Sequence, residues 1–148
     1  MNVPLPKRRS DGPQDRPKHG AGFPEGLASA FYLGVRCEEE CYRARRYGRP
    51  LTLLVVELVG QGGSSGAEER LQSLLRSQLR LSDTAGCLGE KRYAVLLPET
   101  DRDGAATVAS RLVEALPHVR AGIAVHPQDG STLEDLVSAA VQVSERDG

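Results

Sequence analysis

The sequence predicts an α/β sandwich, in which helices pack on a central, mostly antiparallel sheet. The run "LTLLVVELV" at 51–59 is almost continuously apolar and rich in β-branched residues, which is typical of a buried central strand. Along the whole chain, the helical and strand patterns follow the order α-β-α-β-β-α-β-α. A strand-helix-hairpin-helix-strand core of this kind indicates one sheet covered by helices.

The helices are predicted from apolar residues at helical spacing. Gly48 and Pro50 end the first helix, and Ser131 with Glu134 has the spacing of a capping box at the start of the last. The four predicted helices cover about residues 27–47, 67–83, 103–116 and 133–145.

The strands follow from short apolar runs between turn signals. The second and third form a tight hairpin that turns at Gly89, and its tip carries the charged residues Glu90, Lys91 and Arg92. The four predicted strands cover residues 51–59, 83–88, 92–97 and 119–125.

Composition indicates a soluble globular protein. The chain has 148 residues, of which 39% are hydrophobic and 26% charged, and a formal net charge of -1. This near-neutral charge argues against general affinity for nucleic acid or for an anionic membrane. No apolar run approaches the roughly 20 residues that span a bilayer, and the N-terminus lacks the apolar segment of a secretory signal. We therefore expect a cytoplasmic protein.

The chain divides into a tail and one domain. Residues 1–26 hold five of the nine prolines, with glycines and basic residues, and are expected to be disordered because they bury little apolar surface. Residues 27–148 form the single predicted domain. Cys37 and Cys41 lie on one helical face without a CxxC pair or clustered histidines, so we expect buried small hydrophobes and no metal site.

Three stretches of the domain together resemble GGDEF domains, the fold of the diguanylate cyclases. "ECYRARRYGRPLTLLVVEL" is similar to the family's opening helix and first strand. "RLSDTAGCLGEKRYAVLLPETD" runs in register with the segment around the family's catalytic hairpin, and "VRAGIAVHPQDGSTLEDLVSAA" is similar to its last strand and helix. The resemblance covers about a hundred residues in the right order and implies a bacterial signalling protein.

The resemblance also implies that the catalytic residues are lost. The five positions of the family's hairpin motif read Gly89, Glu90, Lys91, Arg92 and Tyr93, so two cations replace the two acids that serve metal binding and catalysis. A cation cannot ligate Mg²⁺, which demands oxygen donors. We therefore expect a degenerate GGDEF domain that is not an enzyme and needs no cofactor.

Two further segments of the family's active site also depart from its pattern. Glu57 keeps a carboxylate at the position of a metal-binding aspartate, but Val59 replaces the acid two positions later. The family's guanine-reading segment corresponds only to the glycine-rich stretch Gly60 to Gly66. We therefore expect no catalytic residues in this chain.

The resemblance also implies that this sequence keeps one ligand site of the family. Many GGDEF domains bind their product c-di-GMP at an RxxD motif upstream of the hairpin, and Arg80 and Asp83 stand in that register with Gly89. Arg111 matches the family's third contributor. Arginine pairs bidentately with guanine O6 and N7 or with phosphate, and aspartate accepts from guanine N1 and N2.

A purely structural interpretation of these residues remains open. Arg80 would meet the dipole at a helix C-terminus, Asp83 would pair with it or cap a turn, and Arg111 would be an ordinary exposed helix residue. The charged tip at Lys91 and Arg92 is either an anion-binding surface or a solvated turn.

Three functions follow as hypotheses. The first is an inactive c-di-GMP receptor that signals to a separate protein partner through the N-terminal tail or the first helix, with a homodimer as a further option. The second is a nucleotide-independent scaffold or protein-interaction module. The third is a residual nucleotide enzyme that depends on Glu57.

Overall fold

The computed structural model of the chain describes residues 26–60, 66–89 and 91–147. The expected N-terminal tail up to residue 25, residues 61–65 of the glycine-rich stretch, and Glu90 lie outside these ranges. Among the described residues, no helix combines the length and the apolar character needed to cross a membrane.

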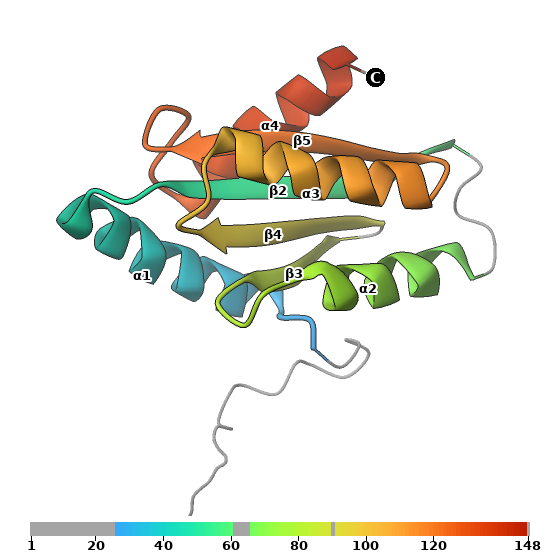
Figure 1. Ribbon diagram of the computed structural model, residues 1–148, viewed down its shortest axis with the longest axis horizontal. Helices are drawn as coiled ribbons and strands as arrows, with labels where there is room; N and C mark the ends of the chain where they lie inside the picture. Colours follow the sequence, from blue (N-terminus) through green and yellow to red (C-terminus); the bar gives the residue numbers. More distant parts are fainter. Residues whose placement is uncertain (1–25, 61–65, 90, 148) are drawn as a thin grey trace, which may run out of the picture.

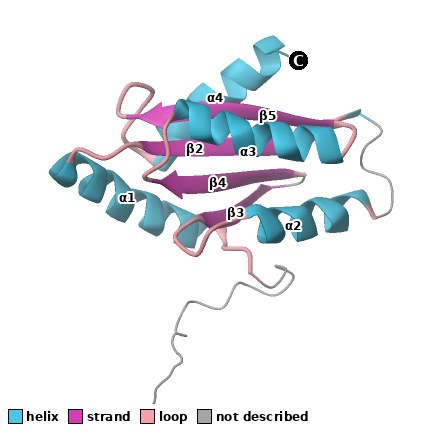
Figure 2. Cartoon of the chain, viewed as in Figure 1, coloured by secondary structure: helices cyan, strands magenta, loops and turns pink. Residues whose placement is uncertain are grey.

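Four strands form one sheet in the order β3-β4-β2-β5, and each neighbouring pair is antiparallel (Figures 1 and 2). All eight residues of β2 are buried, because the strand has a neighbour on each side and helices above and below. The predicted sheet is confirmed, and its strand ends differ from the prediction by one residue. The strands are β2 Leu51–Leu58, β3 Thr84–Gly89, β4 Arg92–Pro98 and β5 Val119–His126.

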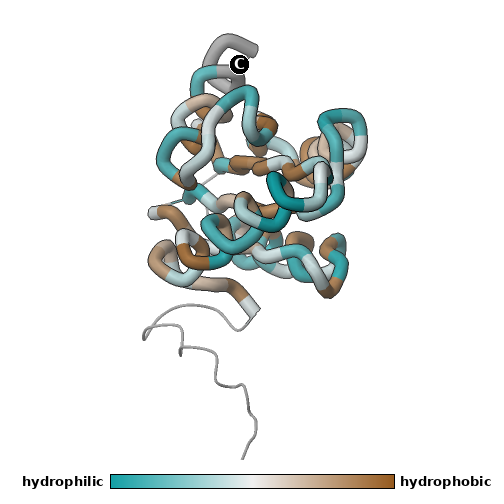
Figure 3. Tube along the Cα trace, turned by 90° about the vertical axis from the view of Figure 1, so that its left-hand side faces the viewer, coloured by the Kyte–Doolittle hydropathy of each residue, from teal (hydrophilic) through white to brown (hydrophobic). Residues whose placement is uncertain are grey.

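Two helices cover each face of the sheet, which gives three layers. The alternation of side chains along β2 divides the core between them. Leu54 and Val56 pack with α2 and α3, whereas Leu53 and Val55 pack with α1 and α4. In Figure 3 the apolar strand segments accordingly run through the middle of the molecule. The helices are α1 Ala30–Tyr47, α2 Ala67–Gln78, α3 Arg102–Ala115 and α4 Leu133–Asp147.

The start of α1 differs from the prediction for a local reason. The Ser29 hydroxyl accepts the Tyr32 N–H at 3.1 Å, so the helix begins at Ala30 and not at residue 27. The two residues before Ser29 instead extend along the edge of the sheet, where the Ala28 N–H donates to the Ala85 carbonyl at 2.8 Å. The N-terminal end of α1 is thereby tied to β3.

The start of α4 corrects the predicted capping box. Thr132, and not Ser131, occupies the cap, because its Oγ1 accepts the Asp135 N–H at 3.1 Å. The Leu136 N–H donates to the Thr132 carbonyl at 3.0 Å, as the first helical hydrogen bond requires. The prediction was wrong by one residue.

Candidate functional site

The turn between α2 and β3 is built around Arg80 and Asp83. Because α2 ends at Gln78, both residues lie beyond the helix, which was predicted to extend through them. The Asp83 N–H donates to the Arg80 carbonyl at 3.0 Å, and the Arg80 N–H donates to Asp83 Oδ2 at 2.9 Å. The side chains form a two-pronged ion pair, with Arg80 Nη2 3.1 Å from Oδ1 and Nε 3.4 Å from Oδ2. The turn therefore fixes the guanidinium from one side.

The guanidinium of Arg80 also reaches the loop between β4 and α3. Its Nη2 lies 2.8 Å from the Pro98 carbonyl and 2.8 Å from Thr100 Oγ1. Its Nη1, in contrast, has no hydrogen-bond acceptor among the described residues. The hydrogen bond to Asp83 raises the pKa of the Arg80 guanidinium, so the group stays charged. Arg80 is thus an oriented cation with one pair of donors free.

A cavity of about 480 Å³ brings Arg80, Asp83 and Arg111 together, because α3 passes alongside the end of α2. Arg111 is exposed and makes no hydrogen bond or ion pair with any described residue. The Asp83 side chain is only 3% exposed, and both of its oxygens accept from Arg80. The two arginines consequently offer open, charged donors to this cavity, whereas the carboxylate is already engaged.

Two acids stand near these arginines, and each has a partner within the chain. Asp101 caps α3, since its Oδ1 accepts the Gly104 N–H at 2.9 Å. Glu99 pairs with Arg49 at 2.9 Å. The loop between β4 and α3, which holds both acids, was not predicted to be part of the site. The sequence did contain one signal for it, because an aspartate directly before a helical pattern is a typical cap residue. Gln78, Thr100 and Thr107 also line the cavity, and no sequence motif identified them.

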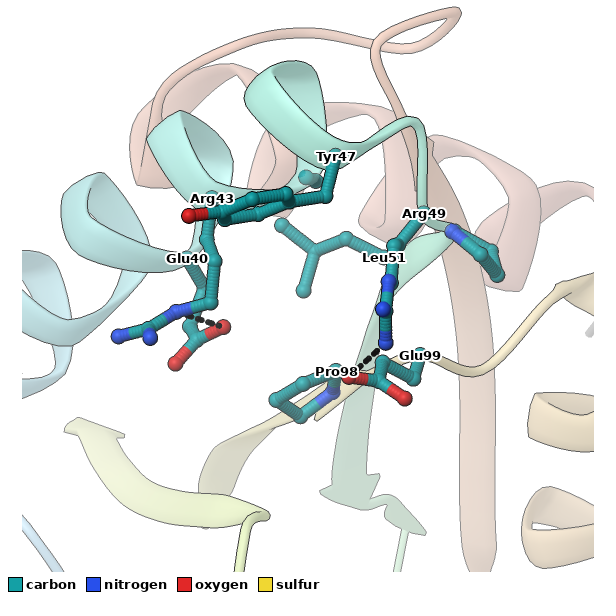
Figure 4. Close-up of a pocket in the computed structure, with 9 residues that line it drawn as sticks. Glu40, Arg43, Tyr47, Arg49, Leu51, Pro98 and Glu99 are labelled. Atoms are coloured by element: carbon teal, nitrogen blue, oxygen red, sulfur yellow. Dashed lines mark hydrogen bonds and ion pairs between the residues drawn. The ribbon is translucent and has the colours of Figure 1, made fainter.

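A smaller hollow of about 200 Å³ lies on the other side of the Arg49–Glu99 pair, and both hollows are lined by Pro50 and Glu99. In Figure 4, Leu51 lies between α1 and the end of β4, and the dashed lines mark the ion pairs around it. Glu40 pairs with Arg36 and Arg43, and Arg49 pairs with Glu99. The smaller hollow therefore presents only paired charges to a ligand.

The hairpin end of the sheet carries a second cluster of charges. Glu57 lies opposite Arg92 of β4 and Arg120 of β5 in the strand register. Arg92 Nε and Nη2 each lie 2.9 Å from Glu57 Oε2, and Arg120 Nη2 lies 3.3 Å from Oε1. Both oxygens of this nearly buried carboxylate therefore accept from an arginine.

The other described residues of the hairpin motif contribute to the fold of the hairpin and its packing. Gly89 ends β3, and Lys91 has a positive φ of 60° at the turn. Tyr93 is 1% exposed, and its hydroxyl donates to Glu68 at 2.7 Å and accepts from Gln72 at 2.8 Å. Burial, reinforced by the Glu68 contact, raises the pKa of Tyr93. The tyrosine thereby ties the hairpin to α2.

The cysteines of α1 lie in the core. Cys37 is 0% exposed and Cys41 is 2% exposed, and both pack with the apolar residues of α1, α4 and the sheet. The predicted burial of these residues as small hydrophobes is confirmed. No group of three or more histidine, cysteine or acidic residues in the described part of the chain could hold a metal ion.

Comparison with solved structures identifies the fold. A sensory box/GGDEF family protein from Caulobacter crescentus is similar with a TM-score of 0.71 and 22% identity, over 82% of this chain and 92% of that one. The active GGEEF domain of a diguanylate cyclase from Vibrio cholerae is similar with a TM-score of 0.72 and 17% identity, over 82% and 93%. The chain thus has the GGDEF fold, as the sequence predicted.

A third similar structure contains a ligand. It is a microbial GGDEF domain described in an interaction with cyclic di-GMP, with a TM-score of 0.67 and 20% identity over 81% of this chain and 84% of that one. No family model matches this sequence. No curated protein matches it either.

Proposed function

We propose that this protein is a c-di-GMP receptor without diguanylate cyclase activity, and that the nucleotide binds in the cavity between Arg80 and Arg111. The observation that supports this proposal most directly is the presence of both arginines, from distant parts of the sequence, around one cavity of about 480 Å³. A GGDEF-fold neighbour described with cyclic di-GMP supports the choice of ligand.

The free donors match the chemistry of a cyclic dinucleotide. Arg80 Nη1 and the guanidinium of Arg111 have no acceptors within the described chain. Phosphate oxygens and the O6–N7 edge of guanine are acceptors that a guanidinium pairs with bidentately. Two arginines facing one cavity would therefore hold an anionic ligand rich in such acceptors.

Asp83 has a different role in this proposal from the arginines. Its carboxylate is almost fully buried and accepts from Arg80 with both oxygens. In this conformation it orients Arg80 toward the ligand and does not read guanine itself. The aspartate of the RxxD motif is then a positioning residue, and its loss would release the arginine.

We also propose that the hairpin neither binds Mg²⁺ nor turns over GTP. Mg²⁺ requires oxygen ligands at short distances in octahedral geometry. The carboxylate of Glu57 is engaged by Arg92 and Arg120, and the cations Lys91 and Arg92 stand where the family has acids. The residues present therefore do not fit the metal, and two nearby guanidinium groups would repel it.

Isothermal titration calorimetry with c-di-GMP tests the receptor proposal. We expect binding by the wild-type protein and an affinity roughly ten- to a hundredfold weaker in Arg111→Ala, because one charge-assisted contact contributes about 1.5–3 kcal/mol. Arg102→Ala is the matched control, since this α3 arginine pairs with Asp129 and does not line the cavity. Absence of binding, or equal affinity in Arg111→Ala and the wild type, would refute the proposal.

A nucleotide-independent scaffold is the second candidate. It is favoured by one observation, namely that Arg80 and Asp83 satisfy each other and brace the β4–α3 loop without a ligand. For either function we propose a protein partner that docks on α1 or on the N-terminal tail. Capture of one partner whose affinity is unchanged by added c-di-GMP would favour the scaffold.

A further inference from the structure

The outer face of α1 carries an exposed aromatic residue between charges of opposite sign. Tyr42 is 59% exposed, although its neighbour Cys41 is buried in the core. One turn earlier lie Glu38 and Glu39, and one turn later lie Arg45 and Arg46. A hollow of about 500 Å³ lies beside the Tyr42 side chain and is also lined by Glu38, Glu39, Arg43, Arg46 and Tyr47. None of the residues that line this hollow lines the cavity at Arg80.

We propose that this face is an interface between two copies of the chain, which pair through antiparallel α1 helices that cross at Tyr42. The proposal is independent of the c-di-GMP site. Because the two-fold axis passes through the crossing point, Tyr42 of one copy would pack against Tyr42 of the other. Such an arrangement is self-complementary and closes with two-fold symmetry.

The positions of the charges specify the antiparallel direction. Residues seven apart lie on nearly the same side of a helix, so Glu38 and Arg45 flank Tyr42 on one side. Glu39 and Arg46 flank it on the other side for the same reason. An antiparallel two-fold brings each acid to the base on its own side, so Glu38 meets Arg45 of the second copy and Glu39 meets Arg46. Parallel helices in register would instead set like charges against each other.

The intrachain contacts leave these charges available. Glu38 and Arg45 make no hydrogen bond or ion pair with another described residue. Glu39 pairs with Arg36 but its side chain remains 53% exposed. Arg46 is held over the Tyr47 ring, with its guanidinium carbon 5.4 Å from the ring centroid. The surface therefore presents two unpaired opposite charges on one side of the aromatic residue.

Sedimentation equilibrium of the full chain without nucleotide tests the interface. We expect a dimer that dissociates at high salt, because exposed ion pairs are screened. Glu38→Arg and Arg45→Glu should each weaken the dimer roughly tenfold or more, since each change places like charges together at two symmetry-related positions. A mixture of the two variants should form a heterodimer, because every pair is then complementary again.

Substitution of two exposed aromatic residues, one at a time, tests whether the association is specific. Tyr42→Ser should abolish the dimer, whereas Phe31→Ser should leave it unchanged, although Phe31 is the more exposed residue at 79%. Far-UV circular dichroism verifies that each variant stays folded. A wild-type protein that is monomeric up to about 1 mM, or variants that fail to complement each other on mixing, would overturn the proposal.

Discussion

Arg92 and Glu57 form a cross-strand ion pair at the hairpin end of the sheet, with Arg92 Nε 2.9 Å from Glu57 Oε2. The pair joins the carboxylate of the central strand β2 to a cation at the start of β4. Arg120 completes the arrangement from β5. A buried carboxylate that would otherwise need a metal or water is therefore satisfied by side chains of the two neighbouring strands.

This ion pair is expected to stabilise the fold measurably. Arg92→Met should lower the free energy of unfolding by about 1–3 kcal/mol, because the nearly buried Glu57 carboxylate loses a partner and keeps only Arg120. Urea denaturation measures this change. The matched control is Arg49→Met, whose pair with Glu99 is more than half exposed on both sides and should contribute less than about 1 kcal/mol. Equal effects of both substitutions would contradict a special role for the buried pair.

The same pair predicts the absence of cyclase activity. Purified protein incubated with GTP and Mg²⁺ should form no product above a blank. Glu57 is the only acidic residue in the described strands β2, β4 and β5, and two arginines hold its carboxylate. Glu57→Gln should therefore leave this background unchanged. Turnover that disappears in Glu57→Gln would instead show that the carboxylate still serves catalysis.

The sheet and its helices were largely predictable because their signals are local. The continuous apolar run of β2 predicts a strand with both faces covered, and the structure has this arrangement. Helix ends were less predictable, since either Ser131 or Thr132 could cap α4 and only backbone geometry decides between them. The loop between β4 and α3 entered the site without any motif, because Arg80 reaches it across space.

The charge cluster at the hairpin shows a different limit of sequence reasoning. The cations Lys91 and Arg92 of the hairpin were visible in the sequence. The pairing of Arg120 with Glu57 was not predictable, because it depends on the order in which the strands associate. The strand order β4-β2-β5 and its register together place Glu57, Arg92 and Arg120 on one face of the sheet.

Arg80 and Arg111 should differ in their effects on stability. Without nucleotide, Arg80→Ala is expected to lower the free energy of unfolding by about 1–3 kcal/mol. The substitution leaves the buried Asp83 carboxylate with only the backbone N–H of residue 80, and it removes the side-chain contacts to the β4–α3 loop. Arg111→Ala should change it by less than about 0.5 kcal/mol, since Arg111 has no partner among the described residues.

Comparison of these two variants separates folding from binding. If both arginines hold c-di-GMP, the two substitutions weaken its affinity although only Arg80→Ala destabilises the protein. Urea denaturation and calorimetry on the same preparations provide both quantities. Weakened binding in Arg80→Ala alone would mean that Arg80 acts by shaping the loop, and Arg111 would then have no part in the site.

His126 is expected to make stability depend on pH. The residue ends β5, is 4% exposed, and its Nε2 has no hydrogen-bond partner among the residues that the structure describes. Burial, and to a smaller extent the charge of Arg45, lowers the pKa of His126 below the ordinary value of 6.5. As the pH falls through 6.5, the unfolded chain therefore binds a proton before the folded one does, and the free energy of unfolding decreases. Above this pH the histidine is neutral in both states and has no such effect.

Substitution of His126 by glutamine should remove this part of the pH dependence. Urea denaturation of wild type and His126→Gln at about pH 7.5 and about pH 5.5 provides the comparison. The carboxylates are common to both proteins, so their contribution cancels in the difference. We expect the wild type to lose more stability than the variant on acidification. An equal loss would mean that His126 accepts a proton in the folded state as readily as in the unfolded chain.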